Sequence, residues 1–239
     1  MRLGVNIDHV ATLRQQRAGL VNYPNLQEAA QMVVAAGADQ VTLHLRQDRR
    51  HIQDDDLIKL TKNRPAPVNL EMAAIPEMTE IAIKTKPEIV CLVPEKREEL
   101  TTEGGLDVVR YKDEISRCIE KLKKNKIRVS LFVEADLEQI KMSKSVGGDA
   151  IEIHTGQYAL AKAGEVSKYI DIISASSRFG HELGLAVHGG HGLHYQNTKP
   201  LLKIPYLEEL NIGHSIICRG VMVGLSQAVK EMRDLMRNP

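Results

Sequence analysis

The chain has 239 residues, of which 43% are hydrophobic and 26% are charged, values that are ordinary for a soluble globular protein. Its formal net charge of +1 gives no global signal for binding to nucleic acid or to an anionic membrane, and no apolar run reaches the roughly 18 residues that a membrane helix needs. Cys91, Cys118 and Cys218 are widely spaced without a CxxC pair, and the first residues carry no signal-peptide pattern, so we expect reduced thiols in a cytoplasmic protein.

Eight short segments are apolar throughout or alternate apolar with polar residues, as strands do when their side chains point to opposite faces. In chain order they cover residues 3–8, 41–46, 67–71, 89–93, 128–134, 149–154, 185–188 and 209–213. The second segment, for example, alternates Val, Leu and Leu with Thr42, His44 and Arg46. One apolar row and one polar row therefore run along this strand.

Helical signals separate these strands. Residues 9–23 are expected to form a loop or a short helix, and Asn25 caps a helix that runs to about residue 36 and stops at Gly37. Pro76 suits the first turn of another helix. The remaining helices are expected over residues 54–62, 76–84, 108–124, 136–144, 159–183, 198–203 and 220–237.

This alternation of strands and helices predicts parallel strands, either in an open doubly wound sheet or in a closed barrel. A doubly wound nucleotide-binding fold should have a glycine-rich turn after its first strand, but residues 8–11 read Asp-His-Val-Ala. Eight strand–helix units in a chain of 239 residues favour the closed barrel. We therefore expect residues 1–239 to form a single (β/α)8 TIM-barrel domain with extra short helices in its loops.

Polar and ionisable side chains gather where seven of these strands end. A polar row on an outer-edge hairpin, or a lone histidine hydrogen-bonded in the core, would explain one such strand but not seven. Unpaired buried charge costs several kcal/mol, so a cluster of this kind is usually retained for a ligand. We predict an active-site mouth lined by Asn6, Asp8, His44, Arg46, Asn69, Glu71, Glu134, Glu152, His154, His188, His191, Gly213 and His214.

Two features predict phosphate binding at this mouth. The glycine-rich segment 189–192 and Gly213 follow the last two strands, where barrels often bind a phosphate, although glycine at a tight turn is the simpler explanation for either loop alone. Arg46 belongs to the inward row, so we assign its guanidinium to the ligand. Arg49 and Arg50 are expected to form surface ion pairs instead.

The residue types found and missing at the strand ends argue against two kinds of site, a Schiff-base lysine and a zinc centre. No strand end carries lysine, which argues against an aldolase that forms a Schiff base through an enzyme amine. The spacing of His188, His191 and His194 is compatible with zinc, but the glycines among them suit a loop better than a fixed set of ligands. We therefore expect no metal.

Several motifs together give the chain a family resemblance. They are GVNIDH at 4–9, HLRQDRRH at 44–51, NLEM at 69–72, LVPEKR at 92–97, TTEGGLD at 101–107, IEIHTG at 151–156, GHGL at 190–193 and NIGH at 211–214. In this order they resemble the pyridoxine 5′-phosphate synthase family over essentially the whole chain. One departure is that the family pattern has Asn-Ala before Gly190, whereas this chain has His188 and Gly189.

The resemblance implies a (β/α)8 barrel that assembles as a homo-octamer and needs no metal or organic cofactor. It implies the condensation of 1-deoxy-D-xylulose 5-phosphate with 3-amino-2-oxopropyl phosphate to pyridoxine 5′-phosphate, phosphate and water, in vitamin B6 biosynthesis. The substrate's own amine would replace an enzyme lysine, and the repeated proton transfers of ring closure suit His and Glu groups that titrate near neutrality.

The resemblance also implies roles for individual residues. Glu71 and His44 would accept protons, His191 would donate one, and Glu152 would stabilise the transition state. The deoxyxylulose phosphate would be bound by Asn6, Asp8, His9, Arg46, His51 and Thr101. The aminoketone phosphate would be bound by Arg17, Gly192, Gly213 and His214. Asp8 and Glu152 have a simpler alternative role, which is to position neighbouring side chains.

Two other functions remain open on the sequence. One is a metal-dependent sugar-phosphate aldolase or isomerase on the same barrel. The other is a non-catalytic protein that binds a phosphorylated ligand or acts as an oligomeric scaffold. The inward Glu and His residues argue against passive binding, which needs hydrogen-bond donors more than acid–base pairs.

Overall fold

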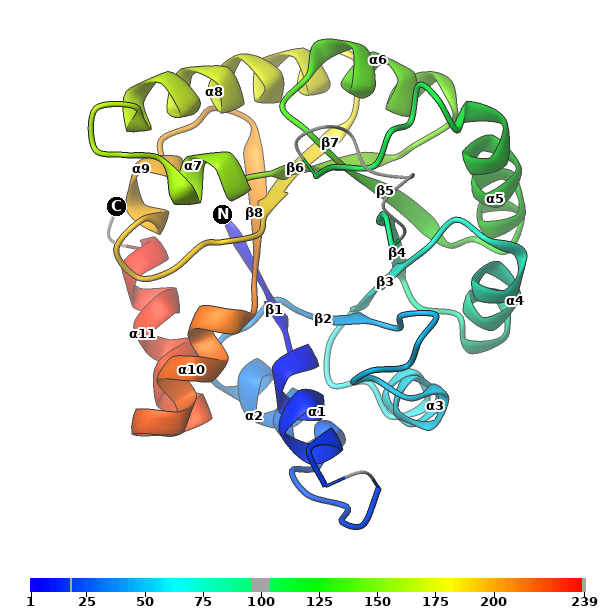
Figure 1. Cartoon of the computed structure of the whole chain (residues 1–239), viewed down its shortest axis with the longest axis vertical. Coiled ribbons are helices and arrows are strands. Elements are labelled where there is room, and N and C mark those ends of the chain that lie inside the picture. The colour runs from blue at the N-terminus through cyan, green and yellow to red at the C-terminus, as the bar shows by residue number, and fades with distance from the viewer. Residues whose placement is uncertain (18, 96–103, 238–239) are drawn as a thin grey trace.

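The computed structural model describes residues 1–17, 19–95 and 104–237. Eight parallel strands close into a barrel in sequence order, with β1 paired to both β2 and β8, and helices surround the barrel (Figure 1). The strands are β1 Arg2–Asn6, β2 Gln40–His44, β3 Val68–Met72, β4 Ile89–Leu92, β5 Arg128–Val133, β6 Ala150–His154, β7 Ala186–Gly190 and β8 Leu207–Ile212. The predicted (β/α)8 barrel is therefore confirmed.

The helices follow the strands as βα units require, with short extra helices in several loops. They are α1 Asp8–Gln15, α2 Leu26–Ala35, α3 Asp54–Lys62, α4 Pro76–Thr85, α5 Lys112–Lys124, α6 Leu137–Ser145, α7 Gly156–Leu160, α8 Val166–Glu182, α9 Thr198–Leu201, α10 His214–Val223 and α11 Leu225–Arg237. Within the described part of the chain, none of them combines the length and the apolar character that crossing a lipid bilayer demands.

The predicted apolar rows pack between the strands and the helices. Val41, Leu43 and Leu45 are fully buried, and they belong to one continuous core with the inner faces of the surrounding helices. Asn25 caps α2 as predicted, because its side-chain oxygen accepts the backbone N–H groups of Gln27 and Glu28. This packing leaves the polar row of each strand facing the barrel interior.

Three predicted helices differ in the structure. The helix expected over 159–183 is two helices, α7 and α8, separated by residues 161–165. The helix expected over 220–237 is also two, because Gly224 takes a left-handed conformation (φ 89°) between α10 and α11. The helix expected from residue 108 begins at Lys112.

A polar network fills the barrel below the mouth. Glu209 accepts hydrogen bonds from Gln40 Nε2 (2.7 Å) and from Arg2 Nε (2.9 Å), and Nδ1 of His188 lies 3.4 Å from its Oε1. His188 is 3% exposed, and burial lowers its pKa despite the charge of Glu209. The expectation that His188 lines the mouth was therefore wrong. The register of β7 against β8 shifts between Val187 and His188, which strand periodicity could not predict.

Candidate active site

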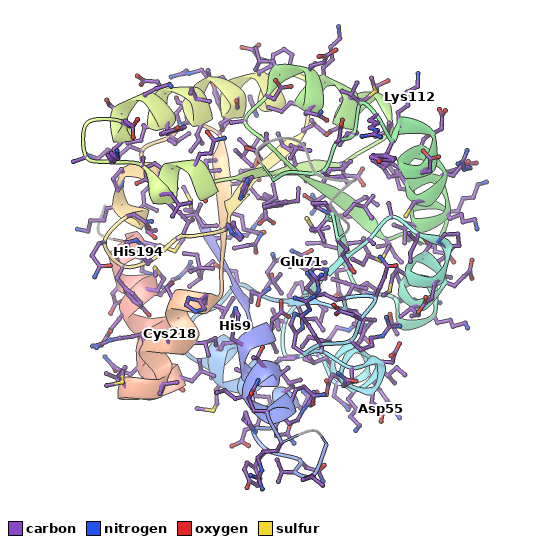
Figure 2. All side chains as sticks on the ribbon, in the orientation of Figure 1. His9, Asp55, Glu71, Lys112, His194 and Cys218 are labelled. Carbon is purple, nitrogen blue, oxygen red and sulfur yellow. The ribbon has the colours of Figure 1, made fainter. Side chains whose placement is uncertain are left out.

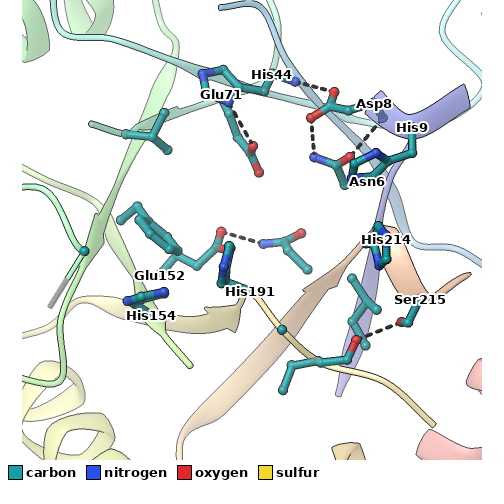
Figure 3. A pocket seen from close by; sticks show the side chains of 18 of the residues that line it. Asn6, Asp8, His9, His44, Glu71, Glu152, His154, His191, His214 and Ser215 are labelled. Carbon is teal, nitrogen blue, oxygen red and sulfur yellow. Dashed lines mark hydrogen bonds and ion pairs between the residues drawn. The ribbon is translucent and has the colours of Figure 1, made fainter. Parts of the chain in front are cut away.

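The polar strand ends meet at one cavity of about 790 Å³, a size typical of small-molecule sites. Figure 2 places Glu71 and His9 toward the inside of the barrel, whereas Asp55 and Lys112 lie on its outer rim. Figure 3 shows the side chains that converge on the cavity from separate strands. Predicted site residues that line it are Asn6, Asp8, His9, His44, Arg46, Glu71, Glu152, His154, His191, Gly192, Gly213 and His214.

Asn69, Glu134 and His188 of the predicted mouth are not part of this lining, and neither are three residues assigned to substrate binding. Arg17 is exposed beyond the end of α1, and His51 lies behind His44, with 6.2 Å between their ring centroids. Burial, followed by the charges of His44 and Arg46, lowers the pKa of His51 to about 4. Thr101 lies outside the described residues. The described geometry therefore does not bring Arg17 or His51 into the cavity lining.

His44 and Glu71 face each other across two neighbouring strands. They are paired in the β2–β3 ladder, and Nδ1 of His44 lies 3.9 Å from Oε2 of Glu71 (Figure 3). Asp8 accepts the backbone N–H of His44 at 2.8 Å and the side-chain amide of Asn6 at 2.9 Å. Burial, and then the negative charges of Asp8 and Glu152, raises the pKa of Glu71 well above its ordinary value. Glu71 can therefore exchange protons nearer to neutral pH than an ordinary carboxyl group.

Glu152 enters the cavity from β6. Its Oε2 accepts a hydrogen bond from Nδ2 of Asn211 at 2.8 Å, and its Oε1 lies against the backbone of Gly190. Burial, assisted by the charge of Glu209, raises the pKa of Glu152 to about 8. At pH 7 this group is mainly a neutral acid, which can donate a hydrogen bond to an oxygen that becomes negative.

His191 takes a left-handed backbone conformation (φ 79°), which is uncommon for a residue other than glycine. The hydroxyl of Thr155 donates to the carbonyl oxygens of Gly190 (2.8 Å) and His191 (2.6 Å), which stabilises this turn. The ring of His191 packs edge-on against His154, whose Nδ1 lies 2.6 Å from Oε1 of Glu134. Burial and the charge of His154 lower the pKa of His191, so the imidazole is mainly neutral in the free protein at pH 7.

Groups suited to phosphate lie on the opposite side of the cavity from the β3 and β4 strand ends. Helix α10 begins there, with Gly213 as its N-cap, and the rings of His214 and His9 meet edge-on at 4.9 Å. A helix N-terminus attracts anions through its unpaired N–H groups and its dipole. Arg46 also lines the cavity; its buried Nε lies 3.5 Å from Oδ1 of Asp48 and forms no hydrogen bond with a described residue.

The strand ends also bring together side chains of the types that bind metal ions. Among the described residues, the group that brings three potential ligand atoms together is Asp8, His44 and Glu71, with these atoms within 4.8 Å of one another. The three histidines considered in the sequence do not form such a group, because His188 lies in the network below the mouth.

Sequence reasoning missed two residues of the site. Glu95 bonds to His44, and Asn211, which lines the cavity, bonds to Glu152. Asn211 lies two residues before Gly213 on the same strand, so period-two alternation could have found it. Glu95 follows Pro94 directly after the fourth strand, the one strand for which no polar end was predicted.

Known proteins resemble this chain over its full length. A family model described as pyridoxal phosphate biosynthesis protein PdxJ matches residues 3–238. A protein of Sulfurihydrogenibium sp. named pyridoxine 5′-phosphate synthase is 52% identical over 100% of this chain and 98% of its own length. A protein of Coxiella burnetii with the same name is also 52% identical, over 99% of this chain and 98% of its own.

Solved structures resemble the fold at much lower identity. The 3-keto-L-gulonate-6-phosphate decarboxylase of Vibrio cholerae has a TM-score of 0.66 at 11% identity, covering 99% of this chain and 97% of its own. The thiamine phosphate pyrophosphorylase of Pyrococcus furiosus has a TM-score of 0.62 at 13% identity, covering 99% and 96%. These two comparisons support the barrel alone.

Proposed function

This chain belongs to the family of pyridoxal phosphate biosynthesis proteins PdxJ, and we propose that the acid–base residues of its barrel mouth carry out the reaction of the synthases in that family. It is an enzyme of vitamin B6 biosynthesis that condenses 1-deoxy-D-xylulose 5-phosphate with 3-amino-2-oxopropyl phosphate. The products are pyridoxine 5′-phosphate, phosphate and water. The observation that supports the residue roles best is the common cavity lined by His44, Glu71, Glu152 and His191.

In this proposal Glu71 and His44 accept the protons that the condensing substrates release. Imine formation, loss of phosphate and dehydration each move protons, and an acid–base group works best when its pKa is near the working pH. The raised pKa of Glu71 supports this role, because its carboxylate is a stronger base than an exposed one. The neutral acid form of Glu152, which stabilises negative charge by donating a hydrogen bond, supports its role at the transition state.

His191 is the proposed proton donor. Its lowered pKa favours the neutral ring in the free enzyme, but two bound phosphate groups bring negative charge to the cavity and favour the imidazolium form. His191 would therefore take up, as the phosphorylated substrates bind, the proton that it later donates.

Two phosphate sites complete the proposal. Asn6, Asp8, His9 and Arg46, with His51 and Thr101, would bind the deoxyxylulose phosphate. Gly192, Gly213 and His214 at the start of α10, with Arg17, would bind the aminoketone phosphate. The start of α10 and the guanidinium of Arg46 in the cavity lining support two anion sites, since both groups attract anions.

We further propose that residues 1–239 act as one barrel domain, in homo-octamers and in the cytoplasm. The family resemblance supports the assembly, and the three free cysteines suit a reducing compartment. Sedimentation of the purified protein tests the assembly: an octamer supports the proposal and a stable monomer contradicts it.

The function is tested by incubating the purified protein with both phosphorylated substrates and following the ultraviolet absorbance of a pyridine product. The proposal predicts product only when both substrates are present, with one phosphate released for each pyridine ring. Turnover should survive exhaustive chelation. Loss of turnover on chelation and its return with a divalent metal would favour the aldolase or isomerase alternative, for which Asp8, His44 and Glu71 could supply ligands.

A further inference from the structure

Glu95 contacts the imidazole of His44 on the side away from Glu71. It lies three residues after the end of β4, and its Oε1 is 3.0 Å from Nε2 of His44. Its second oxygen accepts the backbone N–H of Gln47 at 2.9 Å. The side chains of Glu95 and His44 are only 3% and 12% exposed. Both carboxylate oxygens of Glu95 therefore hold the segment that carries His44.

This contact determines which ring nitrogen of His44 carries the proton. An ionised carboxylate accepts hydrogen bonds and has none to donate, so Nε2 must be the N–H of the neutral ring. Nδ1 then carries the lone pair, and it is this nitrogen that lies 3.9 Å from Oε2 of Glu71. The ring consequently turns its basic atom toward the catalytic carboxyl group.

The surroundings of Glu95 favour its ionised form. Burial by itself raises the pKa of Glu95, but the hydrogen bonds from His44 and the Gln47 backbone, with the charges of His44 and Arg46, outweigh burial and lower it. A negative charge behind the ring stabilises the imidazolium that forms when Nδ1 takes a proton. The position of Glu95 and its negative charge therefore both favour proton uptake at Nδ1 of His44.

We propose that Glu95 is a positioning residue for ring closure, which fixes His44 in the tautomer with hydrogen on Nε2 so that Nδ1 accepts the proton. The substrate bond to hydrogen breaks, an N–H bond forms at Nδ1, and the bonding electrons stay on the substrate. Glu95 itself keeps its charge throughout. The inference rests on the proposed function, because it assigns Glu95 to the histidine proposed as proton acceptor.

The test substitutes Glu95→Gln and measures kcat, KM and unfolding beside the wild-type protein. The glutamine amide keeps the size of the side chain but can present N–H groups to Nε2, which favours the wrong tautomer. We expect kcat to fall by at least about 100-fold, with KM changed by less than about threefold. Glu80→Gln, an exposed glutamate of α4 that pairs with Lys121, is the matched control and should keep wild-type kcat.

Nitrogen NMR of the wild-type histidines gives a readout that does not depend on any variant. The proposal predicts that neutral His44 carries its hydrogen on Nε2, and that Glu95→Gln shifts it toward Nδ1. A wild-type His44 with hydrogen on Nδ1, or a folded Glu95→Gln protein with wild-type kcat, would overturn the proposal. A wild-type protein that makes no pyridine product would instead contradict the proposed function, while the tautomer remains measurable.

Discussion

Glu71 lies directly opposite His44 in the β2–β3 ladder, with 3.9 Å between its Oε2 and Nδ1 of the imidazole. Neighbouring parallel strands in register place the two side chains at the same height on the inner wall of the barrel. The relationship therefore depends on the barrel itself and not on a loop. Two acid–base groups built on rigid strands can share one substrate position without a conformational change.

Thr155 is predicted to be needed for turnover because it stabilises the strained turn at His191. Thr155→Val removes the hydroxyl that donates to the carbonyl oxygens of Gly190 and His191. We expect kcat to fall about tenfold or more, since a small displacement of a catalytic group is costly, and stability to fall by about 1–3 kcal/mol. Thr155→Ser keeps the hydroxyl and should restore most of kcat. Equal losses in both variants, measured by steady-state kinetics and urea unfolding, would contradict this role.

Gly190 is predicted to be required because no other residue leaves room for Glu152. A Cβ atom at position 190 would lie 2.0 Å from Oε1 of Glu152, so Gly190→Ala must displace that carboxyl group. We expect kcat to fall at least about tenfold, with a loss of about 1–3 kcal/mol in stability. Gly164→Ala is the matched control, since a Cβ there has no atom within 4 Å. Wild-type turnover in Gly190→Ala would show that the position of Glu152 does not matter.

The raised pKa of Glu152 predicts a specific pH dependence of stability. Its pKa is about 8 in the folded protein against an ordinary value of 4.5, so between these values the folded state retains a proton that the unfolded state has lost. Stability attributable to this group therefore falls as pH rises from about 4.5 to 8.

Glu152→Gln removes this titration while keeping a similar shape. The variant should gain stability relative to wild type as pH rises, by a few kcal/mol between pH 5 and pH 9. Denaturant unfolding of both proteins at several pH values measures the difference directly. A difference that stays constant over this range would mean that Glu152 is ionised in the folded protein.

The barrel could be predicted from the sequence because its signal is repeated eight times. Apolar rows such as Val41, Leu43 and Leu45 pack outward, so the polar residues between them must face inward. The same argument brings His44, Glu71 and Glu152 together, because all parallel strands end at the same rim.

Three features of the site could not be predicted from the alternation of apolar and polar residues. His188 is buried because β7 continues to Gly190, two residues past its predicted end, so that His188 lies below the rim and pairs with Glu209. The contact of Glu95 with His44 joins residues 51 positions apart, through a loop whose path has no local signal. The left-handed turn at His191 is stabilised by Thr155 from another strand end, so its own sequence does not predict it.

The central claim is that carboxyl and imidazole groups from separate strands perform the acid–base chemistry in one cavity, and Glu71→Gln tests it most directly. Glutamine preserves the shape of the side chain but cannot accept a proton, so kcat for pyridine formation should fall by at least about 100-fold while thermal unfolding stays near that of wild type. Glu114→Gln, an exposed glutamate paired with Arg117, should retain full turnover under the same conditions. A folded Glu71→Gln protein that forms product at the wild-type rate would contradict the account.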